Sequence, residues 1–444
     1  MAAKAFMASL MYPDELHALI KWKLSESKTS EMFADRSKVP PESDPQHNYA
    51  LCYYYLNMCS RSFARVIQEL DDELRHPVCI FYLVLRGLDT IEDDMTLDVK
   101  KKCDILRRFD QIIHQRGWNF QESGPNEADA PLVKEFEVVI EEFLSLKEPY
   151  QKVIADIAKR MGCGFADFCE GKKVVTIEDY NLYTHYAAGL VGLGLTGLFA
   201  ASGLEDPNLD QFPDLANEMG LFLQKVNIIK DFYEDLQDGR RFWPKEIWEQ
   251  YVPEGEDMAV LALPDNRERA LACLNHMCAD ALKLVPSCLE YMSKLRNPSV
   301  IRFCAIPQLM AIATISLFFN NRIIFERAGL KIRRGLTVKL IFQSNTFDSI
   351  KGVYEQYAYE LGDKNHAACN SKNPFDKSFI PIGTSLANIV KWIQINDAKL
   401  GVKRTRQGQF DYITNIGLIL AIITLTIGFW LQYTEAASRT IKEL

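Results

Sequence analysis

Two short clusters of carboxylates are the residues whose spacing points most clearly to chemistry. They read Asp89-Thr-Ile-Glu92-Asp93-Asp94 and Asp231-Phe-Tyr-Glu234-Asp235. In each cluster two aspartates are four residues apart with a glutamate beside them, so on a helix the three share one face. Mg²⁺ prefers oxygen ligands and commonly binds one or two carboxylates together with substrate phosphates. Two such helices facing each other would hold a diphosphate through Mg²⁺ bound by Asp89, Glu92, Asp93, Asp231, Glu234 and Asp235.

Basic and polar residues accompany both clusters. Those nearest are Arg86, Lys230, Arg240 and Arg241, and the block Ser60-Arg61-Ser62-Phe63 lies on the preceding helical pattern. Arg and Lys complement phosphate oxygens that a metal leaves unsatisfied. Each of these residues alone is typical of a surface or structural charge. Together with the acidic clusters they predict that a diphosphate leaves its carbon with help from metal and cations.

The residues that position these side chains form helical patterns. From Asn48 to about Leu361 apolar residues recur at helical spacing, and no hairpin signal or fixed repeat interrupts them. We therefore expect one large all-α domain. The glycines of Gly192-Leu-Gly194-Leu-Thr-Gly197 match a dinucleotide fingerprint, but that fingerprint needs a strand before it, and the flanks here are helical. The glycines are better explained by close helix packing or by room for a ligand.

Two internal runs, Tyr186–Leu204 and Phe303–Asn321, carry no formal charge. The central helices of a large helical domain are apolar all round, so we interpret both runs as core helices rather than membrane spans. The 11 cysteines show no paired CxxC or zinc spacing and are expected to be free thiols, mostly buried.

A different apolar run lies near the C-terminus, where residues 412–434 carry no formal charge. About 20 apolar residues cross a bilayer, so we expect a transmembrane helix here. Lys399, Lys403, Arg404 and Arg406 precede it, which places the large N-terminal part in the cytosol by the positive-inside rule. The N-terminus has no apolar core of the kind that a signal peptide needs.

Composition supports an ordinary folded protein. Of the 444 residues, 48% are hydrophobic and 25% are charged, which excludes a disordered or collagenous chain. The 51 basic and 59 acidic residues give a net charge of −8, a poor balance for general nucleic-acid binding.

Long blocks of the chain resemble the squalene/phytoene synthase family of head-to-head prenyl transferases, and its squalene synthase branch in particular. These blocks are YLNMCSRSFARVIQEL, FYLVLRGLDTIEDDMT, YTHYAAGLVGLGLTGLFAAS, QKVNIIKDFYEDLQDGRRFWP, FCAIPQLMAIATISLFFNN and LKIRRG. The resemblance covers roughly residues 45–365 and the C-terminal anchor. The anchor and LKIRRG fit squalene synthases better than the phytoene or dehydrosqualene branch.

The resemblance implies an isoprenoid-synthase-type helical domain around a central cavity. There two farnesyl diphosphates would condense to presqualene diphosphate with the help of Mg²⁺, and NADPH would reduce this product to squalene. Tyr183 matches the family's catalytic tyrosine. It would act with Asp89, Asp93, Asp231 and Asp235. The alternative is that Tyr183 only lines the cavity while released diphosphate takes the proton.

Further positions match by resemblance. Those for substrate are Ser60, Arg61, Ser62, Phe63, Tyr82, Arg86, Gln224, Asn227, Lys230, Arg240 and Phe303, and those for NADPH are Lys331 and Arg333. A solvated helix end explains the last two nearly as well. Lys230 departs from relatives that carry Arg there, which keeps the charge but loses the planar fork.

The expected organisation is an N-terminal extension (1–44), a catalytic domain (45–365), a tether (366–411), the membrane helix (412–434) and a luminal tail (435–444). The expected location is the endoplasmic reticulum membrane, with a monomeric catalytic domain in the cytosol. Two alternatives stay open: a related synthase without the reductive step, and a non-catalytic helical membrane scaffold.

Overall fold

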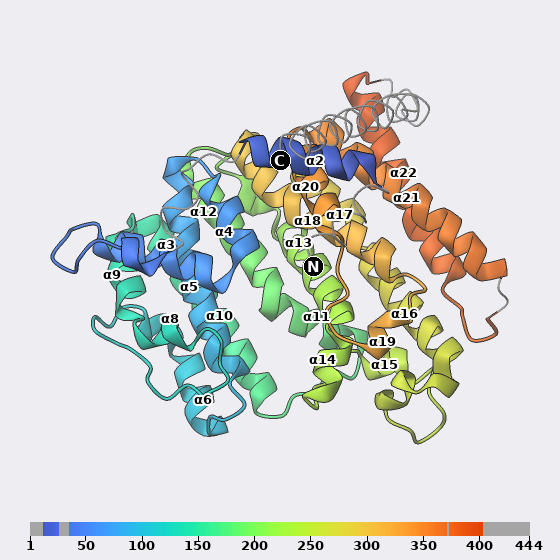
Figure 1. The fold of residues 1–444 in the computed structure, drawn as a ribbon, viewed down its shortest axis with the longest axis horizontal. Helices are drawn as coiled ribbons and strands as arrows, with labels where there is room; N and C mark the ends of the chain where they lie inside the picture. The colour runs from blue at the N-terminus through green and yellow to red at the C-terminus, as the bar shows by residue number, and fades with distance from the viewer. Residues whose placement is uncertain (1–11, 26–34, 371–372, 403–444) are drawn as a thin grey trace, which may run out of the picture. The chain divides into compact units, whose positions relative to one another are not determined.

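The computed structural model describes residues 12–25, 35–370 and 373–402, and their arrangement is drawn in Figure 1. Secondary structure in these ranges is helical, without a strand, which confirms the all-α prediction. All 11 cysteines fall in these ranges and are free thiols. The predicted transmembrane helix and the tail after it lie outside the described residues.

The chain divides into two compact units. The smaller one comprises residues 1–26, 333–342 and 394–444, and the larger one comprises residues 27–332 and 343–393. The larger unit therefore contains most of the segment that we predicted as the catalytic domain.

The larger unit is a set of packed helices with short connections. Its longer helices are α3 (His47–Cys59), α4 (Arg61–Gln68), α5 (Asp72–Asp93), α6 (Val99–Arg107), α9 (Glu137–Ser145), α10 (Glu148–Cys169), α11 (Ile177–Thr184), α12 (Leu190–Ser202), α13 (Pro213–Lys230), α16 (Arg267–Leu282), α17 (Val285–Met292), α18 (Pro298–Phe318) and α21 (Phe347–Asn370). The shorter ones are η2 (Arg36–Lys38), α7 (Phe109–Ile112), α8 (Ala130–Lys134), η3 (His185–Gly189), η4 (Leu209–Gln211), α14 (Phe232–Gln237), α15 (Lys245–Trp248), η5 (Met258–Ala262), η6 (Pro264–Asn266) and α19 (Ile323–Glu326).

Helix α13 is the centre of the larger unit. It packs against α12, α16, α17, α18 and the π-helical turn η3, and Figure 1 shows it running through the middle of this unit. Met219, Phe222, Val226 and Ile229 recur at helical spacing and are all buried. This core packing fixes the position of the end of α13, where the second acidic cluster begins.

The glycine-rich segment is a helix, α12, as its flanks predicted. A methyl group on Gly192 would lie 2.1 Å from the carbonyl oxygen of Ala216, and one on Gly194 would lie 2.4 Å from the ring of Phe81. Both positions therefore need glycine so that α12 can approach α13 and α5 closely. Close packing thus accounts for two glycines of the apparent dinucleotide motif.

Among the residues that the structure describes, two helical stretches are long and apolar enough to cross a membrane by length and composition alone, Ile177–Ser202 and Pro298–Phe318. In α18 most side chains are buried inside the larger unit, from Val300 to Phe318. Burial of this kind is typical of a core helix in a helical domain, as we expected of this run. The first stretch is less buried and contains η3, which is described with the site below.

The smaller unit contains α2 (Pro13–Ser25), α20 (Arg334–Gln343, its last residue belonging to the larger unit) and the end of α22 (Phe379–Leu400). Trp22 of α2 meets Phe342 of α20 edge to face, with ring centroids 6.1 Å apart. The N-terminal extension of the sequence analysis thus contributes an ordered helix.

The segment that we expected to be a tether, 366–411, is mostly helical where it is described. It contains the end of α21, up to Asn370, and the whole of α22, from Phe379 to Leu400. Pro381 falls in the first turn of α22, where a helix tolerates proline. Ile382, Leu386, Ile389 and Ile393 form a buried stripe at helical spacing. This amphipathic stripe holds α22 in the fold although the surrounding composition is polar.

Candidate active site

The first acidic cluster lies at the end of α5. The body of this helix is buried from Leu74 to Ile91, and Asp89, Glu92 and Asp93 follow on its last turn. Burial is the largest cause that raises the pKa of Asp89 to about 7 and that of Glu92 to about 8; neighbouring carboxylates contribute to both shifts, while Arg86 opposes the shift at Asp89. The core helix therefore ends in carboxylates that lack enough positive charge around them.

The second cluster lies where α13 meets α14. We expected one continuous helix, but Asp231 is the junction between the two helices, with Glu234 and Asp235 on α14. The backbone N–H of Asp235 still donates to the carbonyl of Asp231 at 2.8 Å, which keeps the expected one-turn spacing. Burial raises the pKa of Asp235 to about 7. One carboxylate oxygen of Glu234 is buried without a hydrogen-bond partner in the described part of the chain.

Arg240 connects the two clusters. Its Nη1 lies 3.2 Å from Asp93 of the first cluster, and its Nη2 lies 3.1 Å from Asp235 of the second. These two ion pairs show that the ends of α5 and α14 face each other, as the sequence predicted.

A glycine turn places Arg240 at this point. Gly239 has a φ of 74°, in the left-handed region, and its N–H donates to the carbonyl of Leu236 at 3.2 Å. The N–H of Arg240 donates to the carbonyl of Asp235 at 2.8 Å. This pair of bonds is the Schellman pattern that ends a helix and turns the chain back on it. The turn therefore places Arg240 next to the acidic cluster on α14.

The described carboxylates of the two clusters do not form a complete metal site by themselves. Across the described ranges, no three His, Cys, Asp or Glu side chains are set closely enough to hold a metal ion by themselves. Mg²⁺ needs only one or two carboxylates when substrate phosphates supply further oxygens. The donor set is all oxygen, comes from two facing helices and includes the unpartnered oxygen of Glu234. It therefore fits Mg²⁺ bound together with a phosphate-bearing substrate.

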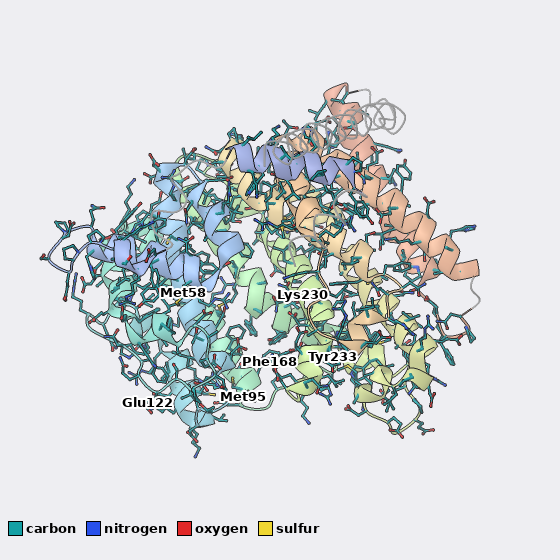
Figure 2. All side chains as sticks on the ribbon, viewed as in Figure 1. Met58, Met95, Glu122, Phe168, Lys230 and Tyr233 are labelled. Carbon is teal, nitrogen blue, oxygen red and sulfur yellow. The ribbon has the colours of Figure 1, made fainter. Side chains whose placement is uncertain are left out.

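Tyr183 lies beside both clusters at the end of α11. Its ring stacks on Phe242, with centroids 4.7 Å apart, and meets Phe168 edge to face at 5.1 Å. Figure 2 labels Phe168 between Met95, which follows the first cluster, and Tyr233, which lies within the second. Burial is the largest cause that raises the pKa of Tyr183, and the carboxylates of both clusters add to it. Tyr183 is therefore a neutral phenol with an aromatic cage around its ring.

A π-helical turn, η3, follows Tyr183 directly. Turns of this type occur frequently at functional sites. Nδ1 of His185 lies 2.6 Å from the side-chain oxygen of Asn217 on α13. A methyl group on Gly189 would lie 2.0 Å from the same oxygen. Asn217 thus anchors the turn to α13 through its hydrogen bond with His185.

The polar block before the first cluster meets it through aromatic and basic side chains. Ser60 caps α4 by accepting the N–H of Phe63 at 3.2 Å, and the Phe63 ring lies 6.5 Å from that of Tyr82. Nη2 of Arg86 donates to the hydroxyl of Tyr82 at 3.2 Å. The backbone at Arg61 and Ser62 belongs to α4, but their side chains lie outside the described part.

Three predicted substrate residues lie on α13. Gln224 is half-buried, Asn227 is exposed, and Nζ of Lys230 donates to the side-chain oxygen of Asn227 at 3.4 Å. Nζ of Lys230 also lies 3.3 Å from Asp231. Lys230 therefore contacts the second cluster directly.

Phe303 lies on α18, away from the carboxylates in the chain, and is 7% exposed. It meets Phe199 edge to face at 6.1 Å. It also lines a cavity of about 300 Å³ with Val66, Ile306 and the ion pair Arg302–Glu69. Phe303 is thus a buried aromatic residue at the wall of this cavity.

The two predicted cofactor residues differ in their surroundings. Lys331 is exposed and makes no ion pair with a described residue. Arg333 instead binds the carboxylate of Glu15 on α2, with Nη2 to Oε1 at 2.6 Å. A phosphate could reach Lys331 directly, whereas Arg333 is already paired with an acid.

Sequence reasoning missed several residues of the site. Asp129 lies 3.7 Å from Nε of Arg86, but it stands in an irregular stretch with no pattern around it. Phe242 is part of the block DGRRFWP and could have been found there. Asn217 has no local signal, because only the folded contact with His185 reveals it.

A model of the squalene/phytoene synthase family matches residues 56–331. The chain belongs to the squalene/phytoene synthase family. Members of this family that resemble it include a squalene synthase of Schizosaccharomyces pombe, 45% identical over 382 residues, which are 85% of this chain and 79% of the relative. A squalene synthase of Homo sapiens is 45% identical over 359 residues, 80% of this chain and 82% of that protein.

A solved structure agrees with this family assignment. The complex of TcSQS with a bound ligand is 42% identical, covers 78% of this chain and 98% of its own, and superposes with a TM-score of 0.73. The segment of this chain that matches the model of the squalene/phytoene synthase family includes both acidic clusters, Tyr183, Arg240 and Lys331.

Proposed function

We propose that this enzyme of the squalene/phytoene synthase family joins two farnesyl diphosphates head to head and reduces the product to squalene. The observation that carries the proposal is the pair of facing acidic clusters, which Arg240 connects through Asp93 and Asp235. The relatives at 45% identity are named squalene synthases, which supports squalene as the product.

In the first half reaction, one farnesyl diphosphate loses diphosphate and its allylic cation adds to the double bond of the other. Loss of a proton closes a cyclopropane and gives presqualene diphosphate and diphosphate. Arg240 and Arg86 provide positive charge for the departing oxygens, and the carboxylates of Asp89, Asp93, Asp231 and Asp235 would hold Mg²⁺. Mg²⁺, when bound, neutralises the charge that develops on the leaving diphosphate.

Tyr183 has two uses in this step. The face of its neutral ring stabilises positive charge through the quadrupole. Its phenol oxygen is a weak acceptor, yet a proton next to a carbocation is acidic enough to transfer to one. Released diphosphate is the competing acceptor. The stacking of Tyr183 on Phe242 fixes the ring in either case.

In the second half reaction, presqualene diphosphate would lose its diphosphate and rearrange, and NADPH, when bound, would be the source of the hydride. Lys331 is exposed in the stretch before α20 and suits a phosphate of the cofactor by its charge. Phe303 and Ile306 provide apolar wall for the hydrocarbon.

The proposal extends to location and assembly. A membrane helix at residues 412–434 would anchor a monomeric catalytic part on the cytosolic face of the endoplasmic reticulum. This part of the proposal rests on the uncharged run and the basic residues before it. Fractionation of cells that express the full chain, with protease protection of each end, tests it.

The activity is tested with the full-length chain in detergent, farnesyl diphosphate and Mg²⁺, with and without NADPH. We expect presqualene diphosphate without NADPH and squalene with it. If NADPH never changes the product, the chain is a synthase without the reductive step. If farnesyl diphosphate is not consumed at all, the non-catalytic scaffold is the correct alternative.

A further inference from the structure

In the block LKIRRG at residues 330–335, the guanidinium of Arg333 is already bound by an acidic side chain of the same protein. The guanidinium of Arg333 binds the carboxylate of Glu15 in a bidentate manner through one edge, Nε to Oε2 at 3.1 Å and Nη2 to Oε1 at 2.6 Å. Its carbon Cζ lies 3.7 Å from the centroid of the Tyr12 ring. A bidentate pair with a stacked ring is the geometry with which Arg recognises carboxylates and phosphates.

The acid in this pair is more deeply placed than the base. The side chain of Glu15 is 7% exposed, whereas that of Arg333 is 46% exposed. A buried carboxylate is expensive unless a cation compensates it. Glu15 therefore needs Arg333, and an anion that competes for the guanidinium edge bound by Glu15 must displace that carboxylate.

Two further features hold α2 in this position. Nζ of Lys339 on α20 donates to Asp14 at 2.8 Å, next to Glu15 in the chain. A methyl group on Gly335 would lie 2.7 Å from Cβ of Glu15 and 2.9 Å from its Oε2. The glycine that ends LKIRRG thus leaves the space in which Glu15 reaches Arg333.

We propose that Glu15 and Asp14 act as an internal competitor for the phosphate of the nicotinamide cofactor at Arg333, so that α2 must move away before that phosphate binds there. The inference rests on the proposed use of NADPH. It assigns to α2 a regulatory role, and to Lys339 and Gly335 the role of holding α2 in the competing position.

The first test is kinetic and uses the full chain. Glu15→Gln removes the competing charge, and Asp14→Asn removes the second ion pair. Gly335→Ala keeps both charges and sterically displaces the Glu15 side chain from its position beside Arg333. Each should lower the KM for NADPH, on the order of tenfold, because a larger fraction of the protein is competent to bind. The value of kcat should stay unchanged. Glu254→Gln, a substitution of the same type on an exposed residue, is the control.

The second test measures α2 without using turnover. Saturating NADPH should speed tryptic cleavage after Lys21 and Lys23, the basic residues toward the end of α2, whereas NADH, which lacks the 2′-phosphate, should not. Glu15→Gln should be cleaved quickly without any cofactor.

The outcomes separate the two proposals. If the wild-type chain makes no squalene with NADPH, the proposed function fails. If it makes squalene but the three variants keep or raise the KM for NADPH, or if NADPH protects α2 from cleavage, then α2 does not compete and Glu15 only anchors the helix.

Discussion

The guanidinium of Arg240 lies 3.2 Å from the carboxylate of Asp93, which is 147 residues earlier in the chain. The same guanidinium lies 3.1 Å from Asp235. Without Arg240, the two facing groups of carboxylates would lose the cation between them and keep Arg86 beside the first and Lys230 beside the second. With it, they form one site that has both metal-binding oxygens and a cation for phosphate.

Replacing Arg240 should therefore impair catalysis more than folding. We expect Arg240→Gln to lower kcat by about 10²–10³-fold, the usual loss when one charge-stabilising donor is removed. The neighbouring Arg241 pairs with Asp257 at 3.1 Å instead, so Arg241→Gln is the matched control. The rate of diphosphate release is measured for both variants. Equal rates in the two would show that Arg240 has no catalytic role in this site.

The carboxylates should be essential for turnover and dispensable for stability. Asp89→Asn and Asp235→Asn each remove a proposed Mg²⁺ ligand and also relieve repulsion within a cluster, so we expect turnover to be lost and the thermal midpoint to be kept. Asp104→Asn, at an exposed aspartate that pairs with Arg108 one turn later, serves for comparison. Near-normal turnover in either cluster variant would refute the metal role.

Tyr183→Phe keeps the ring that stacks on Phe242 and removes only the hydroxyl. If that oxygen takes the proton, formation of presqualene diphosphate should fall strongly. Tyr186→Phe, whose ring packs against Gly164, should behave like the wild type. Rapid-quench measurement of the first product distinguishes them, and an unchanged rate in Tyr183→Phe would leave this residue as cavity lining.

Asn217 should position Tyr183 through the π-helical turn. Asn217→Leu removes the acceptor for His185 and should lower kcat of the first step by about 10²-fold with KM for farnesyl diphosphate unchanged, since small misplacements near the chemistry have such effects. Asn217→Asp restores an acceptor oxygen and should recover most of the rate. Equal losses in both variants would indicate a general packing defect.

A stability prediction concerns the buried ion pair between Lys225 and Asp280. Nζ of Lys225 lies 2.6 Å from Asp280, and the two side chains are only 3% and 6% exposed. Asp280→Asn should destabilise the larger unit by about 3–5 kcal/mol, because it strands a buried charge. The double variant Lys225→Met, Asp280→Leu should lose less in denaturant unfolding. A double variant less stable than Asp280→Asn would contradict this explanation.

Much of this arrangement could be predicted because it depends on local patterns. The all-helical fold follows from apolar periodicity, and the end of α5 could be identified because Asp89, Glu92 and Asp93 follow an apolar run. The facing of the two clusters was a reasonable inference from their shared spacing. Arg240 was also found in the sequence, since it lies just after the second cluster.

The rest depends on contacts that no local pattern contains. The hydrogen bond of Asn217 with His185 and the ion pair of Arg333 with Glu15 join residues that are 32 and 318 positions apart. The helix α22 was missed for a different reason. Its buried stripe from Ile382 to Ile393 is a local pattern, but it lies within the segment 366–411 that was predicted to be a tether.

The central claim is that one site joins two farnesyl units, and an isotope experiment tests it most directly. The full chain is given an equal mixture of unlabelled farnesyl diphosphate and farnesyl diphosphate deuterated on its terminal methyl groups, with Mg²⁺ and NADPH, and the hydrocarbon is analysed by mass spectrometry. We predict squalene in three mass classes, containing no, one and two labelled halves. A hydrocarbon with only one farnesyl unit, or no squalene at all, would contradict the account.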